Sequence, residues 1–129
     1  MSKAAEKAAE KAAYEARVKA ALEEAHVAAE DAYREFRATA KLSPEGHILD
    51  SCGGASIVIY KPSYRFRTTM VALDAMSRGY NGGWRIGGFT RTVNDQSITA
   101  SERACDAAVK VLEKHFPEEP PFYMTSYID

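Results

Sequence analysis

Apolar side chains in the first third of the chain recur at helical spacing. The positions Val18, Leu22, Ala25, Ala29, Ala32 and Phe36 step alternately by four and three residues, with Tyr14 four residues ahead of them. Because this stretch is rich in Ala, Glu, Lys and Arg and lacks Gly and Pro, it predicts one helix over residues 3–40. Such a helix is about 57 Å long, whereas a compact domain of this size has a radius of gyration of about 14 Å. We therefore expect residues 1–17 to project as a solvated segment.

The apolar seam of this helix has two interpretations. It packs on the protein's own sheet, or it pairs with a second copy or with a partner protein. The candidate self-association residues are Val18, Leu22, Ala25, Ala29 and Phe36. Alanine lets two helices approach closely, although it buries little apolar surface. The second interpretation predicts a homodimer.

Three strands are predicted in the middle of the chain. Residues 55–60 are rich in β-branched side chains, and residues 64–73 and 84–91 alternate between apolar and polar positions. Glycines and an Asn-Gly pair within residues 79–83 predict a turn between the last two strands. The end of the second segment, VALDAMSR, also suits a helical turn.

A second helix is predicted over residues 100–115, where apolar side chains share one face. Thr99 and Glu102 form a capping-box pattern at its start, and Pro117 ends it. The tail, residues 117–129, either packs back as a short strand or stays free as a binding segment. The expected class is therefore α+β in the order α-β-β-β-α, with a long N-terminal helix, a three-stranded antiparallel sheet and a C-terminal helix packed on the sheet. Residues 18–116 are expected to form its single domain.

This element order resembles that of a double-stranded-RNA-binding domain. In that family the final helix starts with a lysine-rich stretch, which should fall near Ser101. Here the corresponding residues are Ala100-Ser101-Glu102-Arg103, with one cation and one acid. The family's RNA-binding residues are therefore not carried over to this chain.

Charge is unevenly distributed along the chain. The totals of 17 basic and 18 acidic residues nearly cancel, yet residues 55–92 hold six cations against the single acid Asp74. Aromatic side chains are interleaved with these cations, a combination found in nucleic-acid-binding surfaces. Strand alternation would place four arginines and one phenylalanine on a single sheet face. The predicted residues for binding a protein partner or nucleic acid are Arg65, Arg67, Arg85, Phe89, Arg91, Lys61 and Arg78.

Candidate catalytic chemistry is confined to one turn-rich stretch. His47 and Cys52 lie five residues apart with Asp50 between them, which is the minimum set for a cysteine nucleophile. Cys52 also fits as a small residue entering a strand, and the spacing matches no catalytic signature, so we expect no enzymatic activity.

The sequence also bears on metals, cofactors and membranes. Three scattered histidines and two distant cysteines lack metal-site spacing, so no metal or cofactor is expected. The charged N-terminus differs from a signal peptide, and no apolar run is long enough to cross a bilayer. We expect a cytoplasmic protein without membrane partners.

Two hypotheses for function result. In the first, the chain is a small non-catalytic interaction protein that binds another macromolecule, chiefly a protein, through its long helix or its basic sheet face. By analogy, it would be an accessory protein or inhibitor of the type that phages direct against host nucleic-acid machines. The alternative is direct binding of RNA or single-stranded DNA by an Arg/aromatic sheet face. The pI of 6.3 argues against avid, non-specific nucleic-acid binding.

Overall fold

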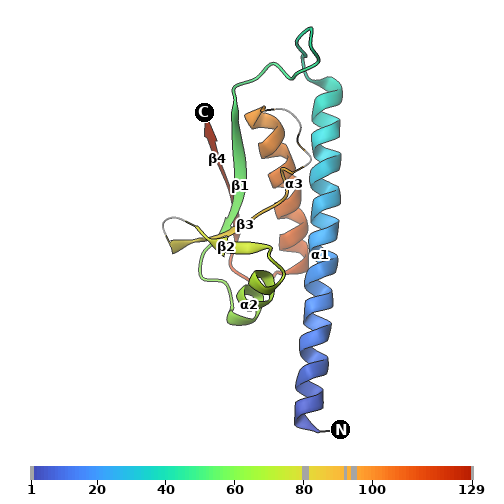
Figure 1. The fold of residues 1–129 in the computed structure, drawn as a ribbon, viewed down its shortest axis with the longest axis vertical. Helices are drawn as coiled ribbons and strands as arrows, with labels where there is room; N and C mark the ends of the chain where they lie inside the picture. Colours follow the sequence, from blue (N-terminus) through green and yellow to red (C-terminus); the bar gives the residue numbers. More distant parts are fainter. Residues whose placement is uncertain (1, 80–81, 92, 94–95, 129) are drawn as a thin grey trace.

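The computed structural model describes residues 2–79, 82–91, 93 and 96–128, which form an α+β fold (Figure 1). The elements, in chain order, are α1 (Lys3–Thr39), β1 (Gly53–Ile59), α2 (Tyr64–Ala72), β2 (Met76–Arg78), β3 (Trp84–Ile86), α3 (Ile98–His115) and β4 (Phe122–Ile128). The strands form one antiparallel sheet in the order β2-β3-β1-β4. The predicted class is confirmed, with four strands in the sheet instead of three.

Helix α1 runs beside the body of the protein and extends past it at its N-terminal end (Figure 1). Its start is capped by Ser2, whose side chain accepts a hydrogen bond from the backbone N–H of Ala5 at 3.1 Å. Residues 3–13 are exposed throughout. The buried positions of the helix are Tyr14, Val18, Ala21, Ala25, Ala29 and Tyr33. The fully exposed part of the helix therefore ends before Tyr14, whereas the expected projecting segment is residues 1–17.

The buried stripe of α1 packs against α3, and not against the sheet as the sequence suggested. Small side chains on both helices, such as Ala25 and Ala108, let the two backbones approach closely. Two ion pairs fasten α1 to the end of α3 and the loop after it: Glu24 with Lys114 at 2.5 Å and Arg17 with Glu118 at 2.6 Å. Val18, Ala25 and Ala29 of the predicted seam are thus buried within the chain, whereas Leu22 and Phe36 are partly exposed, which favours the intramolecular interpretation.

The predicted second strand, residues 64–73, is wrong, because this segment forms the helix α2. Ser63 caps it by accepting a hydrogen bond from the N–H of Phe66 at 3.2 Å, and Glu119 holds Ser63 through its N–H and Oγ, both at 2.7 Å. Phe66 and Met70 are the buried residues of α2. A spacing of four places two side chains on the same face of a strand or of a helix, so alternation alone could not decide between them.

The predicted third strand is shorter than expected. It ends at Ile86, because the following glycines turn the chain away and Gly88 has a φ of +97°. Phe89 is therefore not on the sheet but buried against His26 of α1, with ring centroids 4.5 Å apart. The predicted Asn-Gly turn falls partly outside the described residues, since Asn81 is not among them.

Helix α3 begins two residues earlier than predicted. Its N-cap is Ser97, whose side chain accepts a hydrogen bond from the N–H of Ala100 at 3.1 Å. The predicted capping box of Thr99 and Glu102 is therefore wrong, since both residues lie inside the helix.

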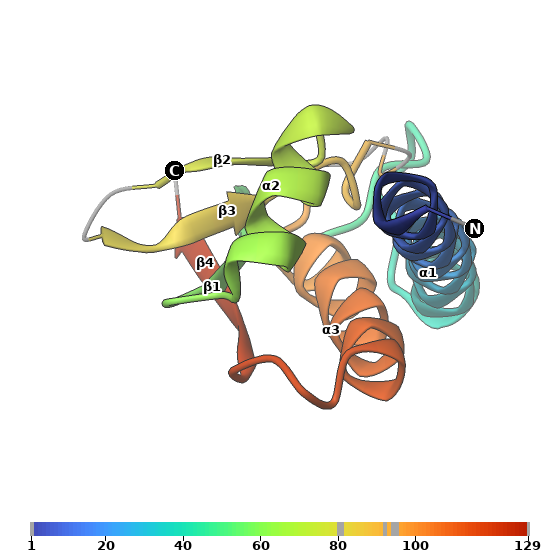
Figure 2. The same cartoon turned by 90° about the horizontal axis from the view of Figure 1, so that it is seen from below.

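The C-terminal tail, for which the sequence left two possibilities, forms the edge strand β4. It pairs with β1 along seven consecutive residues, from Gly53 opposite Ile128 to Ile59 opposite Phe122. Figure 2 shows that α2, α3 and α1 all lie on one side of the sheet. The core is therefore one-sided, and none of the helices in the described residues lies over the opposite face of the sheet.

Candidate binding surface

Strand alternation gives the sheet two chemically different faces. On the inner face, the paired residues Ile86 and Ile57 are buried beneath the helices. The outer face is defined here as the opposite side chains: Ser56, Val58, Tyr60, Ser77, Arg85, Tyr123, Thr125 and Tyr127. One row of it crosses all four strands through Ser77, Arg85, Val58 and Tyr123.

Three exposed tyrosines make the outer face aromatic. Tyr60, Tyr123 and Tyr127 are 42%, 50% and 60% exposed. The rings of Tyr60 and Tyr123 meet edge to face, with centroids 6.0 Å apart. Aromatic side chains on an uncovered sheet leave a large apolar area in water, which is unusual unless a partner covers it.

Two of these tyrosines also have a local structural role. A Cβ built on Gly54 would meet the Tyr127 hydroxyl at 2.6 Å, and one built on Gly83 would meet Cε1 of Tyr60 at 2.9 Å. Each ring therefore lies over a glycine, Gly54 on β1 or Gly83 just before β3, and covers its backbone. Tyr123 lies opposite Val58, so it covers no glycine and has the least structural reason to be aromatic.

The outer face carries little charge. The strand residues 53–59, 76–78, 84–86 and 122–128 contain two arginines and no acidic side chain. Of the two, Arg85 lies on the outer face and is exposed. Arg78 belongs to the opposite phase, with its guanidinium 5.2 Å from the centre of the Trp84 ring.

The single basic face predicted from strand alternation is not formed. In α2, Arg65 stacks on Tyr14 of α1 at 3.9 Å, and Arg67 lies 5.5 Å from the centre of the Trp84 ring. Arg91 follows β3 in the loop near His26 and Gly88. Arg85 alone among the four remains on an open sheet surface, while Lys61 lies just beyond β1 with a φ of 52°. The arginines are thus distributed around the molecule, because the segments carrying them are helix and loop.

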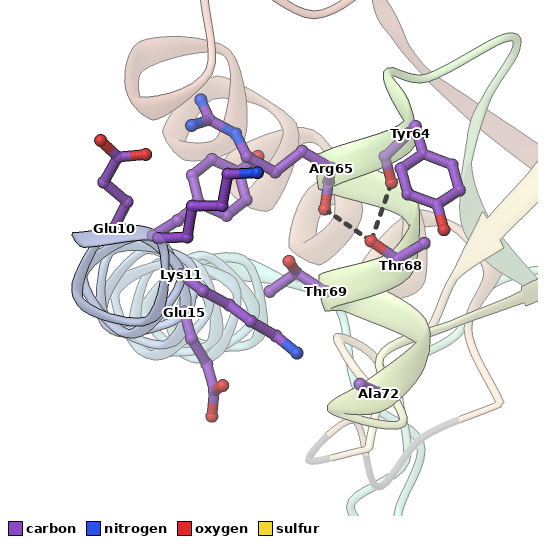
Figure 3. A pocket seen from close by; sticks show the side chains of 10 residues that line it. Glu10, Lys11, Glu15, Tyr64, Arg65, Thr68, Thr69 and Ala72 are labelled. Atoms are coloured by element: carbon purple, nitrogen blue, oxygen red, sulfur yellow. Dashed lines mark hydrogen bonds between the residues drawn. The ribbon is translucent and has the colours of Figure 1, made fainter. Parts of the chain in front are cut away.

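A groove separates the overhanging part of α1 from α2 (Figure 3). It encloses about 480 Å³, and its walls are Lys7, Glu10, Lys11, Tyr14, Glu15, Tyr64, Arg65, Thr68, Thr69 and Ala72. Arg65 extends from α2 toward α1 across this groove, whereas the Thr68 hydroxyl donates back to the Tyr64 carbonyl at 2.9 Å. Cations and carboxylates both line it, so the groove does not select a ligand by the sign of its charge.

The Tyr14 ring beneath Arg65 is buried. Desolvation raises the pKa of its hydroxyl, and the nearby Glu119 carboxylate raises it further. Sequence reasoning missed this contact because it placed Arg65 on a strand, where it could not meet α1.

In the candidate catalytic stretch, the carboxylate of Asp50 has a structural role. Asp50 Oδ2 accepts hydrogen bonds from the Ser97 hydroxyl at 2.7 Å and from the Thr99 N–H at 2.9 Å. These bonds lower the pKa of Asp50 to about 2. Cys52 is exposed, while burial raises the pKa of Cys105 to about 12. Asp50 thus ties the start of β1 to the start of α3.

In the part of the chain that the structure describes, no group of three or more His, Cys, Asp or Glu side chains is arranged to hold a metal ion. None of the helices there combines the length and apolarity needed to cross a bilayer. The chain matches no family model, no curated protein and no solved structure.

Proposed function

We propose that this protein is a non-catalytic interaction protein that binds another protein through the outer face of its sheet. The observation that carries the proposal is the group of three exposed tyrosines on a sheet face that no helix covers. Tyrosine and arginine are the residues in which protein interfaces concentrate binding energy.

The arrangement of polar groups supports a protein partner. Arg85 and Tyr123 flank the half-buried Val58 in one row, giving an apolar centre with polar neighbours. Ser56 and Thr125, whose hydroxyl oxygens lie 3.4 Å apart, add neutral hydrogen-bonding groups to the same face. The aromatic content and low charge of this face agree with protein–protein interfaces, whose cores hold few charged residues.

Direct nucleic-acid binding, the alternative from the sequence, loses support. Phosphate contacts need several cations on one surface, and the outer face holds Arg85 alone. Arg65 and Arg67 are instead stacked on aromatic rings of the chain itself. The tyrosines remain able to stack on bases, so nucleic acid stays as an outcome of the test.

Site-specific photo-crosslinking in the native host tests the proposal. A benzophenone side chain is placed at Tyr123, and the matched control carries it at Val27, which is 53% exposed on α1. We expect position 123, and not position 27, to crosslink a protein other than this chain. Crosslinks to RNA or DNA alone, or only to a second copy, would overturn the proposal.

The identified partner then allows a quantitative measurement. Tyr123→Ser should weaken its affinity by about thirtyfold, as expected for a central aromatic contact. Tyr64→Ser removes a more exposed tyrosine from α2, 73% against 50% for Tyr123, and should leave the affinity unchanged. Equal effects of the two variants would contradict the assignment of the outer face.

A further inference from the structure

The two edges of the sheet differ in length and chemistry. The edge strand β2 has three residues and includes Arg78, whereas the edge strand β4 has seven residues, FYMTSYI, with no charge, proline or glycine. Proteins normally protect exposed edges by keeping them short or charging them, because unpaired backbone groups recruit further strands. The edge at β2 follows this rule, and the edge at β4 does not.

Hydrogen-bond alternation shows which backbone groups of β4 are free. The N–H of Gly53 donates to the Gln96 carbonyl at 2.9 Å, on the side of β1 away from β4. Alternate β1 residues, namely Gly54, Ser56 and Val58, therefore face β4, and their partners Tyr127, Thr125 and Tyr123 face β1. The remaining residues, Phe122, Met124, Ser126 and Ile128, direct their backbone N–H and C=O groups to the open edge.

We propose that a second copy of this chain occupies that edge, with the two β4 strands antiparallel about a two-fold axis at Thr125. In this register all seven residues of each strand overlap. Met124 exchanges backbone hydrogen bonds with Ser126 of the other copy, since both groups face outward. Two four-stranded sheets then join into one continuous sheet.

The side chains of β4 suit pairing with an identical strand. On the outer face, Tyr123 of one copy lies opposite Tyr127 of the other, giving two symmetric aromatic pairs. On the inner face, Ile128, which is 70% exposed in the single chain, lies opposite Phe122. Because β4 carries no charge, the symmetric arrangement brings no like charges together. An unrelated strand would lack this self-complementarity, which is why we assign the edge to a second copy.

Sedimentation equilibrium of the full chain over a range of concentrations tests the assembly. The unmodified chain should be a dimer at micromolar concentration. Ser126→Pro removes an outward N–H without touching the ladder to β1, so it should give a folded monomer. The matched control, Ser126→Ala, keeps that N–H and should remain a dimer. The proposal is overturned if the unmodified chain is a monomer. This includes the case in which the β4 edge of the monomer binds a peptide strand.

A cysteine crosslink tests the register independently of proline substitution. In a Cys52→Ser background, Thr125→Cys should form an intermolecular disulfide on mild oxidation, because a non-hydrogen-bonded antiparallel pair has Cα atoms about 4.5 Å apart. Tyr123→Cys lies on the same face of the same strand, but its symmetry mate is about 14 Å away along the strand, beyond disulfide reach. Efficient crosslinking at 125 and not at 123 supports the two-fold axis at Thr125, and equal crosslinking at both positions overturns it.

This inference and the proposed function can fail separately. Sedimentation and crosslinking of the purified chain need no partner, whereas the photo-crosslinking experiment counts only proteins other than this chain.

Discussion

The two faces of the sheet are made by neighbouring residues of the same strands, yet they have opposite surroundings. Ile57 is fully buried beneath the helices, while Val58, the next residue, lies half-buried on the outer face between Arg85 and Tyr123. The inner face is apolar and covered by α3 and α2, and the outer face is aromatic and uncovered (Figure 2). An antiparallel sheet normally pairs a buried apolar face with a polar face in water. The tyrosines depart from that rule, which is why the outer face is the stronger candidate for binding.

The largest expected difference between the faces is in unfolding free energy. Ile57→Ala leaves a cavity in the one-sided core and should destabilise the protein by about 3 kcal/mol. Val58→Ala, one residue away, removes a half-buried side chain and should cost about 1 kcal/mol. Urea unfolding of both variants measures the two values, and equal costs would mean that the outer face is covered in solution.

A second pair of substitutions compares backbone contact with side-chain contact. A Cβ at Gly53 would lie 2.1 Å from the Tyr127 carbonyl oxygen, which cannot move without breaking the ladder. Gly53→Ala should therefore cost about 2 kcal/mol. At Gly54 the obstacle is the outer end of the Tyr127 ring, which can rotate away, so Gly54→Ala should cost less. The reverse order of stability in thermal melts would contradict the register of β4.

Asp50 helps to hold α3, one of the helices that cover the inner face, in place. Asp50→Ala removes an acceptor at the start of α3 and should lower the unfolding free energy by about 1 kcal/mol at pH 7. The pKa of Asp50 is lowered from 3.8 to about 2 in the folded chain, so its stabilisation is present above pH 3.8 and is lost as pH falls through about 2. Urea titrations at several pH values should show the two proteins converging in acid. A difference as large at pH 2 as at pH 7 would show that the carboxylate charge is not responsible.

Sequence patterns predicted the elements whose periodicity is long and unambiguous. Helix α1 extends over ten turns without Gly or Pro, and α3 has an apolar stripe, so both were placed within two residues of their observed starts. The strand predicted over residues 64–73 is wrong because Phe66 and Met70 fit both periods, and Ser63 caps a helix there instead. In the observed helix, the ring of Phe66 contacts the rings of Phe116 and Phe122.

The candidate site was harder to predict because it joins distant segments. Tyr60 follows β1, while Tyr123 and Tyr127 lie in the tail, more than sixty residues further along the chain. For β4, the sequence leaves both a short strand and a free tail possible, because two prolines precede FYMTSYI. The predicted arginine face failed for the same reason as the predicted strand. Of its four arginines, Arg85 alone lies on an open strand surface.

The smallest expected difference compares two arginines from the predicted face. Arg67 lies 5.4 Å from the centre of the Tyr64 ring and 5.5 Å from that of Trp84, on the side of the sheet that the helices cover. Arg67→Ala should therefore destabilise the protein by about 1 kcal/mol, through lost cation–π contact and packing. Arg85→Ala, on the exposed outer face, should change the unfolding free energy by less than about 0.5 kcal/mol. Chemical denaturation in low and high salt measures both. If Arg85 proves the costlier to remove, its side chain has a structural partner on the outer face, and that face is less available for binding than proposed.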